Sequence, residues 1–482
     1  MKMRSKLLSL LAGGAIFAAG CGTSIGTATT LDGPGVGGQN YRTSHPVGDA
    51  VAATVTDKQV HAFYVDSTDG DLRHYWQDKS SGTKVDRFEV IDGNSTVGGR
   101  TTNKIDNAIA AFTFEGTVHV AYKDAVTGSL RHAWYNNGWR YEIIDGAGSK
   151  CDRPAEAAGF DCPSTTNSMG SQIVGIVWDS GDYIPHLVYR DDTTGTLRHA
   201  WFFISPAHPN NEAWKFWRFE NVDTGVAAMP KSTRIGVAEA NAQMHIFYIK
   251  QGGLTNASLG HAWANFMVPG WGVEYLDGPL GKAAGATSND IAGEPSAVVT
   301  STGIDVFYQD ATRKILQNVR YTPATGWALT NDGLDGNGTC CGNGRSGNKV
   351  GRFTVAQKLN DRAVVAYYDE DRGGINWGVL DKNGVWGQQQ LDGAPLTPLC
   401  DIQKLLGACS DIDGRTDAPV GNWMAAANDG DNIYLFNGRA ATKGIPAATQ
   451  TNLRLITIGI PKASPLGDIA GLLGPLLGLL GL

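Results

Sequence analysis

An Arg-His-x-Trp sequence occurs three times and carries the side chains best suited to bind a ligand. The copies are Arg73-His74-x-Trp76, Arg131-His132-x-Trp134 and Arg198-His199-x-Trp201. The guanidinium group of arginine donates hydrogen bonds to hydroxyl or carboxylate groups, while aromatic side chains pack against the apolar C–H surfaces of a ligand. This chemistry suits sugars, so these nine residues are our candidate ligand-binding set. The alternative is that each arginine pairs with an aspartate of a hairpin turn or of the adjacent repeat.

Histidines recur with the same regularity, which argues against a catalytic role for them because an active site is needed only once. His61, His119, His186 and His245 open one set of strands, and His74, His132, His199 and His261 lie in the next, two residues before a tryptophan. We interpret them as structural residues that bond to a neighbouring strand and stack beside the tryptophans. The alternative is a set of equivalent ligand sites between repeats. We assign no catalytic residue and no metal site.

The element that must position these side chains is a repeated unit, best seen in 119–145. Alternating apolar residues predict strands at 118–123, 130–135 and 139–144, with a turn at 124–128. Asp124 can accept a bond from the backbone two residues on, and Gly128 tolerates a positive φ. A small, apolar run before each copy, such as 107–112, 173–178 and 292–299, predicts an innermost strand.

An Asp marker, usually followed by Gly, closes each unit. The markers are Asp32, Asp92, Asp145, Asp223, Asp277, Asp335 and Asp392, spaced 60, 53, 78, 54, 58 and 57 residues apart. This period, with about four strands per unit, predicts the blades of an all-β propeller. The seventh unit, 432–458, lacks a fourth strand, and the N-terminal segment 27–33 is a fourth strand without a blade. We therefore expect seven four-stranded blades, closed by the N-terminal strand completing the last blade.

The N-terminal segment is typical of a lipoprotein signal peptide. Lys2, Arg4 and Lys6 precede an apolar run, 7–19, and small residues stand directly before Cys21. We expect residues 1–20 to be removed, Cys21 to be lipidated, 21–26 to be a tether, 27–460 to be the propeller and 461–482 to be an apolar Gly/Pro/Leu-rich tail. These features predict a protein exported across a bacterial cytoplasmic membrane and anchored by lipid in the envelope, at the outer membrane or cell surface.

The charge balance excludes one class of partner. The chain has 40 Lys and Arg against 47 Asp and Glu, and loss of the three signal charges leaves a formal charge of −10. Nucleic-acid affinity depends on neutralising phosphates, so we expect no nucleic-acid partner. We expect a monomer whose partner is a glycan or an envelope protein.

Six further cysteines lie in three insertions, each directly after an Asp marker. In an oxidising compartment they suggest local bridges, Cys151 with Cys162 and Cys400 with Cys409. Adjacent Cys340 and Cys341 either bridge each other or pair elsewhere. These insertions should emerge on the same face of the disc as the turns between second and third strands. Within the third, Asp411-x-Asp413-Gly414-x-x-Asp417 is a minor calcium candidate, and an ordinary turn is the alternative.

The hairpins, followed by a Gly-Trp strand at Gly138-Trp139, Gly270-Trp271 and Gly326-Trp327, resemble the repeats of the fucose-specific lectin propellers over residues 27–458. The resemblance implies sugar sites between blades built from an arginine, a glutamate and aromatic residues. Arg73, Arg131 and Arg198 would match the arginine. The third-strand tryptophans would match the aromatic wall, which would have to come from the neighbouring blade, and histidine stands where the glutamate is expected.

The favoured interpretation is therefore a non-catalytic, lectin-like envelope lipoprotein without a cofactor. One alternative is a propeller polysaccharide lyase or glycosidase acting on acidic glycans, for which His186, Tyr189 and Arg198 would supply suitable residue types. Another alternative is a protein-interaction platform with the cysteine-bearing loops as its contact surface.

Overall fold

The computed structural model describes residues 24–34, 36, 41–79, 84–150, 164–179, 183–208, 210–211, 215–228, 234–252, 256–265, 268–330, 333–336, 346–380, 384, 386–393, 420, 423–438 and 452–459. The signal peptide, Cys21, the six paired-cysteine candidates, the calcium candidate and the tail lie outside these residues. In the described part of the chain, no helix has the length and apolarity needed to cross a membrane.

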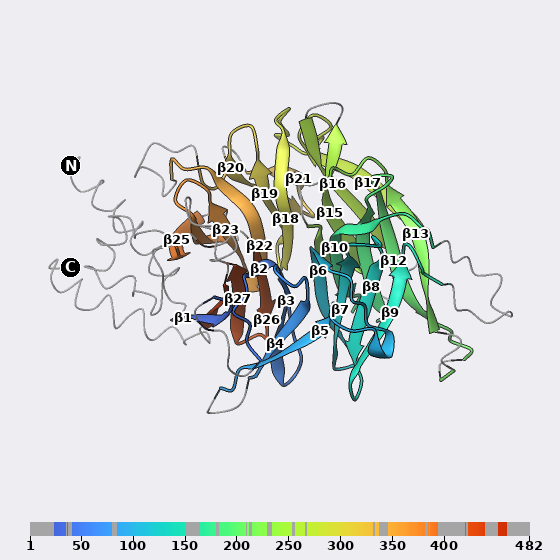
Figure 1. The fold of residues 1–482 in the computed structure, drawn as a ribbon. Coiled ribbons are helices and arrows are strands. Elements are labelled where there is room, and N and C mark those ends of the chain that lie inside the picture. The colour runs from blue at the N-terminus through green and yellow to red at the C-terminus, as the bar shows by residue number, and fades with distance from the viewer. Residues whose placement is uncertain are drawn as a thin grey trace, which may run out of the picture.

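Seven antiparallel sheets of four strands follow one another around a ring, as the spacing of the Asp markers predicts (Figure 1). Blade 1 contains β2 (Val47–Val55), β3 (Gln59–Asp66), β4 (Leu72–Asp78) and β5 (Arg87–Asp92). Blade 2 contains β6 (Ile105–Phe114), β7 (Thr117–Asp124), β8 (Leu130–Tyr135) and β9 (Trp139–Asp145). Blade 3 contains β10 (Met169–Val177), β11 (Pro185–Asp191), β12 (Thr196–Ile204) and β13 (Lys215–Asp223).

The remaining blades repeat this order. Blade 4 contains β14 (Gly236–Ala240), β15 (Gln243–Gly252), β16 (Asn256–Asn265) and β17 (Val268–Asp277). Blade 5 contains β18 (Ile291–Thr300), β19 (Gly303–Asp310), β20 (Ile315–Thr322) and β21 (Gly326–Leu329). Blade 6 contains β22 (Val350–Leu359), β23 (Arg362–Asp369), β24 (Gly374–Leu380) and β25 (Trp386–Asp392). Blade 7 contains β26 (Met424–Asn428), β27 (Asn432–Gly438) and β28 (Leu453–Gly459).

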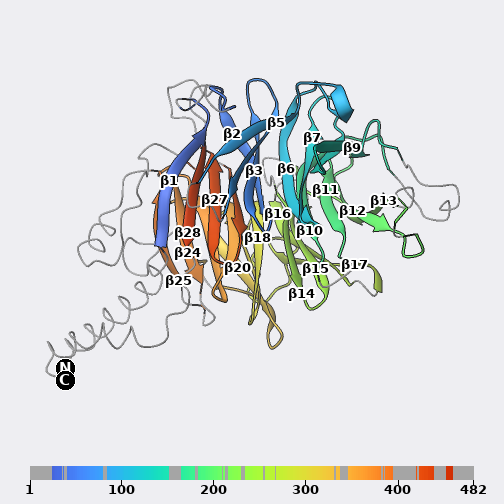
Figure 2. The same cartoon turned by 90° about the horizontal axis from the view of Figure 1, so that it is seen from below.

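The N-terminal strand β1 (Ser24–Asp32) completes blade 7, which confirms the expected closure. It pairs antiparallel with β28 from Ser24 opposite Gly459 to Asp32 opposite Leu453. Figure 2 shows β1, in blue, beside the red strands of the last blade. The pairing supplies β28 with a partner along its outer edge, so that edge does not offer free backbone groups to another chain.

The cores lie between the facing sheets of successive blades. The core shared by blades 2 and 3, for example, joins Phe112 and Leu130 to Leu187 and Tyr189. Burial of each such side chain contributes roughly 1.5–3 kcal/mol to folding. The expected small residues do line the inner strands, where Ala108 and Ala110 of β6 are buried. The rigid packing of blade against blade fixes the side chains that emerge between them.

The hairpin chemistry expected from the sequence is present. Asp124 Oδ1 accepts hydrogen bonds of 2.9 Å from the backbone N–H groups of Val126 and Thr127. Gly128 adopts a φ of 72°. A β-carbon at this position would approach Ser168 to 2.6 Å at Oγ, so the close packing of the turn on the next blade also requires glycine.

Near the ring axis, Arg234 spans from blade 4 to the opposite side. Its guanidinium donates hydrogen bonds to the carbonyl oxygens of Val51 in blade 1, at 2.8 Å, and Met424 in blade 7. Arg234 lies with Ala50, Asn107, Ala108 and Trp423 around a cavity of only about 10 Å³. Arg234 therefore links blade 4 to the inner strands of blades 1 and 7.

Candidate functional site

Each Asp marker bonds to the blade that follows it. Asp92, which is fully buried, accepts hydrogen bonds at Oδ1 from the backbone N–H groups of Gly93 (2.9 Å) and Thr101 (2.6 Å). Its Oδ2 accepts a bond from the hydroxyl of Tyr122, 2.6 Å away in blade 2. The same tyrosine bond, at 2.6–2.8 Å, recurs in six blades, formed by Tyr64, Tyr122, Tyr189, Tyr248, Tyr308 and Tyr367.

The three candidate arginines belong to this network. Arg73, Arg131 and Arg198 donate from Nε to Asp32, Asp92 and Asp145 of the preceding blade at 3.1–3.3 Å. All three are buried. The structure thus shows the pairing with an adjacent repeat that the sequence left as an alternative, and their role in ligand binding stays a prediction. Arg454 of β28 makes the equivalent bond to Asp392 at 2.8 Å. Its Leu-Arg dipeptide matches the other third strands, but the decayed seventh repeat concealed it.

The recurring histidines form a hydrogen-bonded chain within each of blades 1 to 4. In blade 2, His119 Nδ1 lies 3.0 Å from His132 Nε2, and His132 Nδ1 lies 2.8 Å from Glu142 Oε1. The corresponding pairs are His61 with His74, His186 with His199, and His245 with His261. The third-strand histidines stack on Trp76, Trp134, Trp201 and Trp263 at centroid distances of 4.8–5.1 Å.

Burial keeps several of these imidazoles uncharged. It lowers the pKa of His61 to about 3, of His119 to about 2 and of His245 to about 4, and the second histidine of each pair lowers it further. A group with such a pKa is a poor proton acceptor near neutral pH. This agrees with the structural interpretation of the histidines.

A recurring glutamate, which sequence analysis missed, lies at the end of each histidine chain. Glu89, Glu142, Glu220 and Glu274 come from the fourth strands, each three residues before the marker, and that constant spacing could have revealed them. Glu142 Oε1 also accepts a 2.8 Å bond from the indole N–H of Trp217 in blade 3. The expectation that histidine replaces glutamate between the blades is therefore wrong, because both residue types are present on adjacent strands.

A cavity of about 350 Å³ opens between the outer strands of blades 2 and 3. One wall comes from β9 and the residues after it, including Tyr141, Glu142 and Lys150. The other comes from β13, including Lys215 and Trp217. Of the candidate ligand-binding residues, the structure places Arg131 in this lining. The tryptophan from the neighbouring blade is Trp217 of the fourth strand, not one of the candidate third-strand tryptophans. Trp134, His132 and the candidates of blades 1 and 3 are not part of the lining.

Three cationic side chains and one carboxylate from the described residues line the cavity. Arg131, Lys150 and Lys215 surround it, and Glu142 is the one carboxylate among the described residues of its lining. Burial raises the pKa of Tyr141 to about 12, so its hydroxyl stays protonated and donates to the carbonyl of Ile91 at 2.7 Å. The Glu142 side chain is 33% exposed, and both of its described bonds end on Oε1. Its carboxylate is therefore accessible from the cavity.

No protein-family model and no curated protein matches the chain. Solved structures with a similar fold include an α-L-arabinanase from Penicillium chrysogenum, at 10% identity and a TM-score of 0.43, covering 73% of this chain and 93% of that one. An α-L-arabinofuranosidase from Fusarium graminearum is similar at 10% identity and a TM-score of 0.41, covering 73% and 92%. An α-L-arabinofuranosidase from Lactobacillus brevis is similar at 9% identity and a TM-score of 0.36, covering 74% and 94%.

These comparisons correct two expectations from the sequence. The similar structures are an α-L-arabinanase and two α-L-arabinofuranosidases, and not fucose-specific lectins. This finding contradicts the non-catalytic, lectin-like interpretation and the expectation that the chain is more likely not an enzyme. The lectin-like pattern misled because its recurring arginines and tyrosines bond to the Asp marker of the preceding blade. The repeat pattern therefore reports blade packing.

Proposed function

We propose that this chain is a glycan-cleaving enzyme that acts on acidic polysaccharides, with the cavity between blades 2 and 3 as its substrate site. The observation that carries the proposal is the composition of that cavity. The cavity is lined by cationic side chains, an aromatic wall and one accessible carboxylate, which come from two adjacent blades. Sugar sites combine such apolar walls with a few placed polar groups.

The charges favour a substrate that carries carboxylates. Lys150 and Lys215 stand on opposite walls of the cavity, and Arg131 lies deeper, where Asp92 offsets part of its charge. A uronate carboxylate between the two lysines would gain charge-assisted hydrogen bonds. Trp217, whose indole is held by Glu142, presents the aromatic side of the same site.

Glu142 is the proposed proton-transfer group. In a β-elimination, its carboxylate takes the C5 proton next to the uronate carboxylate, and the released electron pair forms the C4–C5 double bond. The C4–O bond breaks, and a lysine ammonium gives the leaving oxygen its proton. Hydrolysis instead uses two carboxylates about 5–10 Å apart. Since Glu142 is the one carboxylate among the described lining residues, elimination fits this cavity better.

The test is an assay of the purified chain on uronate-containing polysaccharides. Two products are measured: new reducing ends and unsaturated uronate. We expect unsaturated products from the native chain and loss of turnover in Glu142→Gln. Glu89→Gln is the matched control, because Glu89 makes the same bonds to His74 in its own blade 1 and to Trp139 in blade 2. Equal activity in native protein and Glu142→Gln, or no cleavage of any acidic glycan, would overturn the proposal.

We also propose that the enzyme is exported and held at the bacterial envelope by a lipid on Cys21. The basic residues Lys2, Arg4 and Lys6, the apolar run that follows them and the small residues before Cys21 support this placement. Labelling with a fatty-acid probe should mark the native chain and leave Cys21→Ser unlabelled. Labelling of both chains would contradict a lipid at Cys21.

A further inference from the structure

In blades 2, 3, 5 and 6, a three-residue motif fastens the loop that enters the blade to the blade's own hairpin turn. It is Thr or Ser, then one residue, then Asn, as in Thr101-x-Asn103. The amide of Asn103 donates to Asp124 Oδ2, at the end of β7, at 2.9 Å. The same bond joins Asn167 to Asp191, Asn289 to Asp310, and Asn348 to Asp369 at 2.6–2.8 Å.

Blade 1 departs from this motif at two positions that meet in space. His45 replaces the asparagine, two residues after Thr43, and its partner is still the turn aspartate, Asp66. Three residues beyond Asp66 stands Asp69, where the next two blades have Thr127 and Thr194. Both changes introduce a side chain of a type that binds metal ions.

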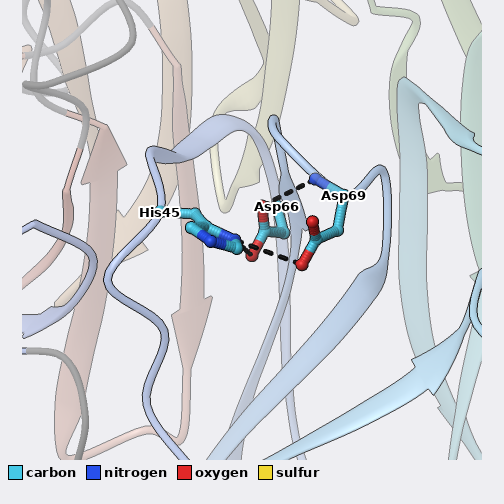
Figure 3. A group of neighbouring side chains, drawn as sticks. All are labelled: His45, Asp66 and Asp69. Carbon is cyan, nitrogen blue, oxygen red and sulfur yellow. Dashed lines mark hydrogen bonds and ion pairs between the residues drawn. The ribbon is translucent and has the colours of Figure 1, made fainter.

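The three side chains point toward one another (Figure 3). His45 Nδ1 lies 3.1 Å from Asp66 Oδ2 and 3.2 Å from Asp69 Oδ2. Among the described residues, this is the group of His, Cys, Asp or Glu side chains that brings three ligand atoms together, all within 4.8 Å of one another. Ligand atoms at about 2.0–2.2 Å from a tetrahedral zinc ion are about 3.4 Å apart, so small side-chain rotations would admit an ion.

Asp66 is held in place for such a role. It is buried, its Oδ1 accepts the backbone N–H groups of Thr68 at 3.0 Å and Asp69 at 3.2 Å, and its Oδ2 accepts the hydroxyl of Thr43 at 3.0 Å. Bonds of this kind orient ligating carboxylates. The side chains of His45 and Asp69 are 38% and 53% exposed, so an ion has an entry path and can complete its coordination with water.

We propose that His45, Asp66 and Asp69 form a binding site for a divalent transition-metal ion of the zinc class. One imidazole nitrogen with two carboxylate oxygens suits such an ion better than calcium, which takes oxygen ligands. The ion would fasten the loop after β1 to the turn between β3 and β4, in the blade that adjoins the closure of the ring.

The blades themselves supply the test variants. His45→Asn and Asp69→Thr restore the residues that blade 2 carries as Asn103 and Thr127, so both should keep the loop bond and the fold. Zn²⁺ is titrated into chelator-treated full-length protein by calorimetry, with Ca²⁺ in parallel. We expect one Zn²⁺ bound per native chain and a loss of affinity of about tenfold or more in each variant.

A gain-of-site variant gives an independent readout. Asn103→His with Thr127→Asp should build the same triad around Asp124 and raise the stoichiometry to two Zn²⁺ per chain. Absence of Zn²⁺ binding, unchanged binding in both restoring variants, or tighter binding of Ca²⁺ than of Zn²⁺ would overturn the proposal. Thermal unfolding in chelator should be the same for native protein and both restoring variants, which separates lost metal binding from lost folding.

Discussion

The hydroxyl of Tyr122 donates a 2.6 Å hydrogen bond to Asp92, across the boundary between blades 2 and 1. Both side chains are buried, and Asp92 also pairs with Arg131. Burial raises the pKa of Tyr122 well above its ordinary value, and the nearby Asp92 raises it further, so the hydroxyl remains a donor. This bond and its five counterparts add a polar link within the apolar cores at six of the seven blade junctions.

Removing that hydroxyl should destabilise the ring. In Tyr122→Phe, the buried Asp92 loses a donor, which costs about 1–3 kcal/mol. Urea unfolding of native and variant protein measures the difference. Tyr135→Phe is the control, because Tyr135 is 48% exposed and should change stability little. An equal decrease in the free energy of unfolding in the two variants would show that the inter-blade bond does not stabilise the ring.

Stability should fall as the pH drops below about 6.5. His61, His119 and His245 have folded-state pKa values of about 3, 2 and 4 because they are buried beside a second histidine. In the unfolded chain, histidine has a pKa of about 6.5, so these three side chains take up protons there that they do not take up in the folded state. Each of the three histidines therefore lowers the free energy of unfolding at pH 5 by on the order of 2 kcal/mol. This stability is fully present above pH 6.5 and is lost progressively as the pH falls toward these folded-state values.

Chemical denaturation at pH 7 and pH 5 measures this loss. His119→Gln keeps a neutral polar group and should show a smaller drop between the two pH values than the native protein. The same free energy of unfolding at both pH values would mean that the histidine pairs accept protons without cost.

The closing strand should be needed by the whole last blade. Leu31 of β1 is buried in the core shared by blades 7 and 1, so Leu31→Ala should cost about 2–5 kcal/mol. We also expect faster hydrogen exchange of the β28 amides, which pair with β1. Thr29→Ala, at an exposed position of the same strand, is the control. Normal β28 protection in a clearly destabilised Leu31→Ala would argue that β1 only covers the blade.

Lys150 should set the preference for acidic substrates. If it contacts a uronate, Lys150→Ala should raise KM for an acidic polysaccharide about tenfold, equivalent to about 1.4 kcal/mol. Lys58→Ala, on an exposed turn of blade 1, is the matched loss of charge. A similar KM increase in both variants would indicate a general charge effect and not a contact in the cavity.

The ring of blades could be predicted from the sequence because the sequence features that define a blade are local and occur repeatedly. Marker aspartates, alternating apolar residues and the unpaired segment at 27–33 gave the number of blades and the closing strand. The cavity could not be read in this way, since Trp217 and Glu142 meet only through the packing of two blades. The loop motif was missed for a related reason: Asn103 and Asp124 are 21 residues apart, and their link appears only when the hairpin is folded.

The same repetition explains the error in function. Residues that recur in several blades, such as Arg131 in four and Tyr122 in six, are those that join one blade to its neighbour. Residues that mark a site are departures from the repeat, as His45 and Lys150 are. Sequence reasoning gave most attention to the first kind.

Ser24 pairs with Gly459 at the seam where the first and last strands meet. The start of the first strand and the end of the last strand therefore lie side by side. A short peptide joining 24 to 459, with new ends placed in an exposed hairpin, would yield a circular permutant with the same blade neighbours.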